Sequence, residues 1–139
     1  MTARLAALQA YQFSLAVPSP GRGTFDAAAA GRGRAVFVGA GRCAACHSGP
    51  ELTDANARLH PASDAVSEPE PGGVPSHASR SATKLYRTTP LRALVRHAPY
   101  FHNVIAATLE AVVDLYNTRK ALNLTAQQKA DLVQYLRSL

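Results

Sequence analysis

The chain has 139 residues, the length of one domain, and 27 of them are alanine, so bulky apolar side chains are scarce although 47% of the residues are hydrophobic. No apolar run approaches the roughly 20 residues that a bilayer-spanning helix needs, which excludes a membrane-embedded protein. Two cysteines are too few to hold a chain of this length together as a disulfide scaffold. The formal charge is +6, but the basic residues are spread along the chain as single arginines, and this dispersion argues against nucleic-acid binding.

Residues 1–20 are predicted to form an N-terminal helical arm. An early arginine and apolar residues such as Leu5 and Leu8 superficially resemble a secretory leader. Polar residues interrupt the apolar stretch, however, and no convincing cleavage site follows it. We therefore expect a short amphipathic helix that ends at Pro18 and Pro20, and an export signal that is not present in this chain.

A second helix is predicted after Asp26, a favourable N-cap residue followed by four alanines, and it runs into a turn near Gly39. Gly31 and Gly33 lie inside it and each cost about 1 kcal/mol relative to alanine. A close-packing reason for a glycine is therefore expected. Gly33 and Phe37 lie four residues apart, on one face of the helix.

The remainder is predicted to be a long loop at about 60–82 followed by two helices. The loop is rich in Pro, Ser and Gly and has no periodicity, and a loop of this length is usually functional or mobile. Apolar residues recur at helical spacing after Thr108, and Thr125 and Gln128 form a capping box for the last helix. No strand pattern is visible, so the predicted fold class is all-α, with residues 21–139 as a single domain.

Residues 43–47 read Cys-Ala-Ala-Cys-His, the C-x-x-C-H pattern of covalent haem attachment. In this pattern Cys43 and Cys46 each add to one vinyl group of a haem, and His47 places its imidazole under the iron as proximal ligand. A zinc site is disfavoured because there is no second cysteine pair, and a thioredoxin-like redox pair because there is no βαβ pattern. The scarcity of bulky apolar residues supports one haem c, which brings a large apolar plate of its own to bury.

Three stretches carry a family resemblance: CAACHSGPELTD at 43–54, TPLRALVRHAPYFHNVIAATLEAVVDLYN at 89–117 and LTAQQKADLVQYLRSL at 124–139. In order and spacing they resemble a c-type cytochrome domain, specifically the C-terminal haem domain of the bacterial di-haem cytochrome c peroxidase and MauG-like family. The resemblance implies a cytochrome c-like helical fold wrapped around one covalently attached haem. It also implies that the first and last helices of the domain cross, with Gly33 and Phe37 on one side. Leu132 and Tyr135 then face them from the other side.

The residues leave the second axial ligand open, and a methionine is disfavoured because the only methionine is Met1. The resemblance makes Tyr116 the first candidate, at the position where MauG-like proteins place a ligating tyrosine; otherwise it is an ordinary half-buried helix aromatic. His102 is the second candidate, although the matching histidine of the related peroxidases lies near the haem without ligating it. Arg92 is expected either beside a haem propionate, which a guanidinium holds bidentately, or at the surface.

Four further side chains are weaker candidates for the iron. His97 and Tyr100 share the stretch that contains His102, and His60 and His77 belong to the predicted loop, where we expect exposed, solvated imidazoles. An anionic oxygen ligand would favour ferric iron and therefore a low reduction potential.

Two functions from different classes follow. The favoured one is a mono-haem c-type cytochrome that transfers electrons and docks through its basic surface on an acidic redox protein partner. The alternative is the haem domain of a peroxidase or MauG-like enzyme that reacts with hydrogen peroxide. Such enzymes resemble this chain but need two C-x-x-C-H sites, and this chain has one, so a second haem would have to come from elsewhere. Neither a nucleic-acid partner nor a membrane span is expected. The location is expected to be periplasmic, because the attachment of haem to a C-x-x-C-H motif resembles a process that takes place outside the bacterial cytoplasm.

Overall fold

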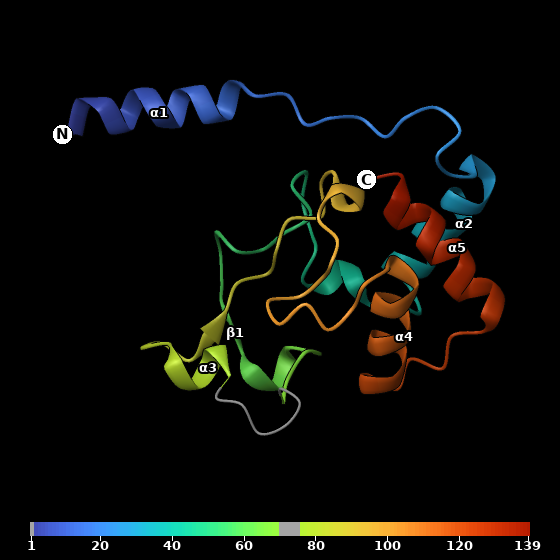
Figure 1. The fold of residues 1–139 in the computed structure, drawn as a ribbon. Coiled ribbons are helices and arrows are strands. Elements are labelled where there is room, and N and C mark those ends of the chain that lie inside the picture. The colour runs from blue at the N-terminus through green and yellow to red at the C-terminus, as the bar shows by residue number, and fades with distance from the viewer. Residues whose placement is uncertain (1, 70–75) are drawn as a thin grey trace.

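The computed structural model describes residues 2–69 and 76–139, and its packed body is formed by three helices. Helix α2 (Ala27–Val38) packs along α5 (Ala126–Arg137), and α4 (Leu109–Arg119) packs against α5. Figure 1 shows these three helices gathered on one side of the molecule, with the irregular middle of the chain on the other. Segments from the two ends of the domain therefore build its core.

The close crossing of α2 and α5 explains the glycine inside α2. A Cβ atom on Gly33 would lie 2.0 Å from the Asp131 carbonyl oxygen and 2.9 Å from Tyr135 Cβ. One turn further on, the ring of Phe37 meets the ring of Tyr135 edge-on at a centroid distance of 5.1 Å. The expected helix crossing, with Gly33 and Phe37 facing the last helix, is confirmed.

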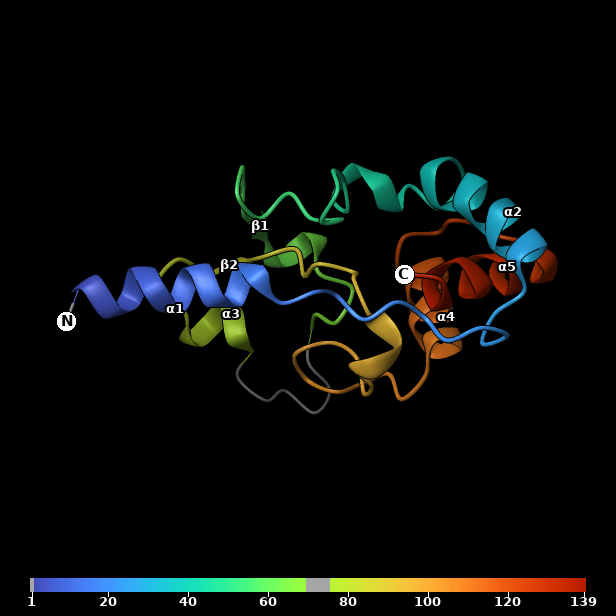
Figure 2. The ribbon, with the colours of Figure 1, turned by 90° about the horizontal axis from the view of Figure 1, so that it is seen from above.

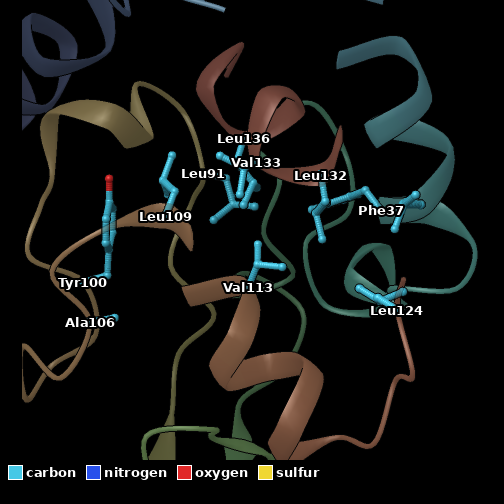
Figure 3. Close-up of a cluster of buried hydrophobic side chains, with 11 residues drawn as sticks. Phe37, Leu91, Tyr100, Ala106, Leu109, Val113, Leu124, Leu132, Val133 and Leu136 are labelled. Atoms are coloured by element: carbon cyan, nitrogen blue, oxygen red, sulfur yellow. The ribbon is translucent and has the colours of Figure 1, made fainter. Parts of the chain in front are cut away.

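The core is a cluster of eleven buried side chains, ten of which are labelled in Figure 3. They come from the three helices and from the segments that flank α4: Val36, Phe37, Leu91, Tyr100, Ala106, Leu109, Val113, Leu124, Leu132, Val133 and Leu136. Among the described residues no large side chain is fully buried.

Side-chain caps define where the three helices begin. The Asp26 carboxylate accepts a hydrogen bond from the Ala29 amide at 2.9 Å, and the Thr108 hydroxyl caps α4 in the same way. At α5 the predicted capping box is present in both directions. The Gln128 amide donates to the Thr125 hydroxyl at 3.2 Å, and the Thr125 amide donates to the Gln128 side chain at 2.8 Å.

Helix α1 (Thr2–Ser14) stands away from the packed body, to which an extended segment joins it (Figure 1). Its leucines are exposed, Leu5 by 63% and Leu8 by 51%. In the part of the chain that the structure describes, no helix is both long enough and apolar enough to cross a membrane.

Short elements organise the chain between α2 and α4, as the view from above shows (Figure 2). They are η1 (Cys43–Ala45), β1 (His60–Pro61), η2 (Ala62–Asp64), α3 (His77–Arg80), β2 (Leu85–Tyr86) and η4 (Leu94–Arg96). The two strands are antiparallel, with His60 opposite Tyr86. The expectation of an unstructured loop over 60–82 missed β1, η2 and α3, because elements of two to four residues are too short to show a periodic pattern.

Candidate haem site

The C-x-x-C-H turn follows directly from the end of α2. The Gly41 amide returns to the Val36 carbonyl oxygen at 2.8 Å, and a Cβ on Gly41 would lie 2.8 Å from that same oxygen, so the approach requires glycine. The chain then enters η1, where the His47 amide donates to the Cys43 carbonyl oxygen at 2.9 Å. Cys43 and Cys46 are both free thiols and half-buried. The turn thus brings the three residues of the motif together.

The imidazole of His47 is oriented by the chain that follows it. Its Nδ1 atom donates a hydrogen bond to the Leu52 carbonyl oxygen at 3.0 Å, which leaves Nε2 as the nitrogen able to bind a metal. Burial lowers the pKa of His47, against the opposing effects of the Leu52 hydrogen bond and the Asp54 charge. A neutral imidazole with a fixed tautomer is the form that a metal requires.

The surroundings of the motif fit a large apolar cofactor that bonds two cysteines. Nine apolar residues pack against the core while remaining only partly buried: Cys43, Ala44, Leu52, Leu94, Phe101, Val112, Leu122, Tyr135 and Leu139. Cys43 and Ala44 of the motif are in this set, so part of the half-exposed edge of the core lies beside the motif. Two thiols, an oriented imidazole and a half-buried apolar rim suit a haem c held by Cys43, Cys46 and His47.

Tyr116, the first candidate for the second axial position, projects from α4 toward the motif. Burial raises the pKa of Tyr116 to about 12, and charge on Cys43 and on Cys46 adds to the rise. The centroid of its ring lies 6.0 Å from the centroid of the Phe101 ring. The phenol is therefore held in an apolar environment near both cysteines.

His102 lies in a polar cluster. Its Nδ1 is 3.3 Å from the Ser67 hydroxyl and its Nε2 is 3.8 Å from a Glu68 carboxylate oxygen. The ring also packs near that of Tyr86, at a centroid distance of 5.3 Å. Both ring nitrogens face polar groups of the protein, which suits a hydrogen-bonding neighbour better than an iron ligand.

The other residues singled out in the sequence lie in different places. Arg92 pairs with Glu51 at 2.9 Å and its side chain is 40% exposed, a surface ion pair. Tyr100 is buried in the core, and burial raises the pKa of its phenol. His97 is exposed beside η4, and the side chain of His77 falls outside the described part of the structure.

The expectation of a solvated His60 is wrong. His60 is 8% exposed, and its Nε2 lies 3.0 Å from the carboxylate of Asp54, which is also 8% exposed. Arg58 donates to the same carboxylate from Nε at 2.6 Å. Burial raises the pKa of Asp54, but hydrogen bonds from Thr88, Arg58 and His60 outweigh it and hold that pKa well below its usual range.

Asp54 and its partners were therefore missed by the sequence analysis. The spacing of Asp54 and Arg58, four residues apart, was the one signal that pointed to this contact. The pairing of His60 with Asp54 depends on the path of the chain between them, which has no periodic pattern.

An oriented histidine next to two free thiols, on a helical frame whose partly buried apolar residues include Cys43 and Ala44, defines a c-type haem domain. The comparison with known families agrees: the family Cytochrome c matches over residues 30–139. The chain belongs to the cytochrome c family, and this membership implies covalently bound haem c and haem-based electron transfer.

Among curated proteins the chain is similar to enzymes named cytochrome-c peroxidase. It is 31% identical to IdrP1 of Denitromonas iodatirespirans over 188 aligned positions, which cover 100% of this chain and 50% of that protein. It is 29% identical to IdrP1 of Pseudomonas sp. (strain SCT), over 78% of this chain and 39% of that protein. The chain thus spans at most about half the length of these relatives. No solved structure matches at comparable significance. The resemblance to the peroxidase family is confirmed at the level of the haem domain.

Proposed function

We propose that this chain is a single-haem electron-transfer domain, with haem attached through Cys43 and Cys46 and with His47 Nε2 as an axial ligand. The hydrogen bond from His47 Nδ1 to the Leu52 carbonyl carries the proposal, because it presents Nε2 beside the two thiols. Haem c supplies a reversible one-electron couple at its iron when bound. The chain's part is to fix the imidazole and to exclude water with its apolar rim.

We propose Tyr116 as the second axial ligand. It is supported by its burial within electrostatic reach of both cysteines, by the lack of a methionine other than Met1, and by the polar contacts of His102. A phenol whose pKa is about 12 keeps its proton at neutral pH unless a metal cation favours its release. Tyrosine ligation therefore favours the ferric state and a low reduction potential.

The partner and the location are parts of the same proposal. A formal charge of +6 suits transient docking on an acidic redox protein, since opposite charge accelerates encounter. The C-x-x-C-H motif supports a periplasmic location, because haem attachment to this motif is a process outside the bacterial cytoplasm.

A second candidate function is a peroxidase-like reaction with hydrogen peroxide. It is favoured by the name cytochrome-c peroxidase carried by the relatives and by the fact that the chain spans half of one of them. Because the chain contains one C-x-x-C-H motif, this function requires a second haem from another segment or subunit.

The first experiment counts the haem. Intact mass and the pyridine haemochrome spectrum of the protein matured in a competent host should show one thioether-linked haem per chain. A colourless protein, or haem that organic extraction removes, would contradict covalent attachment. The second experiment adds stoichiometric hydrogen peroxide to the ferric protein. An unchanged spectrum supports the electron carrier, and rapid formation of a ferryl-like spectrum supports the peroxidase.

The ligand assignment is tested with a matched pair of variants. Tyr116→Phe removes only the hydroxyl and should change the ferric optical and electron paramagnetic resonance spectra to those of an open or water-ligated iron. His102→Gln keeps a hydrogen-bonding side chain at the other candidate position and should leave those spectra unchanged. The reverse pattern would assign the position to His102.

A further inference from the structure

The buried carboxylate of Asp54 connects the turn at Arg58 with strand β1, and Arg58 extends the contact to the cysteine motif. Asp54 accepts hydrogen bonds from Arg58 Nε at 2.6 Å and from His60 Nε2 at 3.0 Å. His60 in turn belongs to β1 and is held opposite Tyr86 of β2. The carboxylate is thus fixed by a neighbouring turn and by the small sheet together.

The guanidinium of Arg58 reaches from this carboxylate to the motif itself. Its Nη2 atom donates to the Ala45 carbonyl oxygen at 2.8 Å and lies 3.9 Å from Cys46 Sγ. Ala45 is the residue between the two cysteines that directly precedes Cys46. One side chain therefore joins Asp54 to the backbone and to the sulfur of the second attachment residue.

The geometry gives this contact more weight than an ordinary surface ion pair. The Arg58 side chain is 55% exposed, but its rigid guanidinium donates both to the buried Asp54 carboxylate and to the Ala45 carbonyl oxygen, and these two bonds restrain its orientation. The turn that it holds also contains the bond from the His47 amide to the Cys43 carbonyl. Fixing Ala45 and Cys46 therefore fixes the position of His47.

The same cluster has the composition of a cation site. One ligand atom each of Cys46, Asp54 and His60 lies within 4.8 Å of the others. Arg58 already bonds to the Asp54 carboxylate and approaches the Cys46 sulfur, so its guanidinium is the cation in contact with this group. The contacts favour the arginine over a metal ion.

We propose that Arg58, held by Asp54, is a positioning residue that fixes the Ala45–Cys46 segment and keeps a positive charge beside the attachment sulfur. This inference rests on the proposed function, because it assumes haem at Cys46. A fixed positive charge near the cofactor favours its reduced, less positive state. Arg58 therefore raises the reduction potential of the domain.

The test uses the haem-loaded full chain and a matched control. Arg58→Gln should shift the ferric to ferrous equilibrium about fivefold toward ferric, about 40 mV for a one-electron couple. Arg58→Lys keeps the charge but cannot form both bonds, so its ferric to ferrous equilibrium constant should lie within about twofold of the wild-type value. Its electron paramagnetic resonance lines should broaden as the position of His47 becomes less uniform. The control is Arg137→Gln, which loses the same charge from a pair with Glu110 at 2.7 Å at the end of α5 and should shift the equilibrium less than twofold.

Each outcome bears on one proposal. A wild-type protein without thioether-linked haem refutes the proposed function and with it this inference. A loaded Arg58→Gln protein whose potential and spectrum match those of Arg137→Gln overturns the inference alone. If Arg58→Gln fails to fold, unchanged line widths in Arg58→Lys overturn it instead. Stoichiometric zinc on the haem-free chain that His60→Gln abolishes would also overturn it, because a metal would then be the cation of this cluster.

Discussion

Replacing Gly33 by alanine tests the closest contact in the fold. The added Cβ would lie 2.0 Å from the Asp131 carbonyl oxygen, more than an ångström inside the 3.4 Å at which ordinary contact begins. The obstructing atom is backbone, so no side-chain rotation relieves the clash. Helix α5 must move away from α2 by about 1 Å, which forfeits a quarter to a half of the dispersion energy at the contacts that it loosens.

The cost can be estimated from what α5 buries. Leu132, Val133 and Leu136 are each less than 7% exposed, and burial of such a side chain stabilises the fold by about 2 kcal/mol. Losing a quarter to a half of that sum lowers the free energy of unfolding by about 2 to 3 kcal/mol, in the range of overpacked cores. Gly31→Ala is the matched control in the same helix.

The measurement is urea unfolding of the haem-loaded protein followed by far-ultraviolet circular dichroism. A Cβ on Gly31 meets nothing within 4 Å, so Gly31→Ala should raise the free energy of unfolding by about 0.5 to 1 kcal/mol. Opposite signs for the two variants are the expected result. A Gly33→Ala protein within about 0.5 kcal/mol of wild type would refute the reasoning, because it would mean that α2 and α5 do not approach at this point.

Three further substitutions probe the stability of the helical frame. Asp131→Asn removes the carboxylate that accepts from Arg32 at 2.7 and 2.9 Å, a pairing that lowers the pKa of Asp131. The stabilisation that this ion pair gives the folded state is complete above the pKa of Asp131 in the unfolded chain, about 3.9. It is lost as the pH falls through the lower pKa of Asp131 in the folded state. Urea unfolding should therefore show a deficit for Asp131→Asn at pH 7 that disappears in acid, and a deficit that persists in acid would contradict this origin. Thr125→Ala removes the N-cap of α5 and should lower the denaturation midpoint, at an unchanged m-value, by the equivalent of about 1 kcal/mol; an unchanged midpoint would show that the cap is dispensable. Phe37→Leu should cost about 1 kcal/mol through loss of the edge-on contact with Tyr135, and the same substitution in a Tyr135→Leu background should cost measurably less.

The three helices of the packed body and the residues at which they begin could be predicted from short sequence patterns. Asp26, Thr108 and Thr125 each accept a hydrogen bond from the first turn of the following helix, and the residues that do so are recognisable by type and spacing. The glycine at position 33 was anomalous in a helix and predicted a close packing contact, and the family resemblance identified the last helix as the partner. Such signals are readable because each depends on residues only a few positions apart.

The haem motif was readable for the same reason. Cys43, Cys46 and His47 are neighbours in the chain, and their spacing is that of the C-x-x-C-H motif, in which three residues bond one haem. The second axial position is different in kind. Tyr116 was chosen through a family resemblance, and its place near Cys43 and Cys46 depends on how α4 packs against α5.

Contacts between distant, irregular segments were the part that could not be anticipated. His60 was expected in solvent, yet it is buried against Asp54, and Arg92 was expected near a propionate or at the surface, where it pairs with Glu51. Periodicity reports which face of a helix is apolar, but an irregular loop has no repeating face. Its polar side chains find partners only when the whole chain has folded, because a buried carboxylate such as Asp54 must be paired by whichever donors the tertiary structure brings within reach.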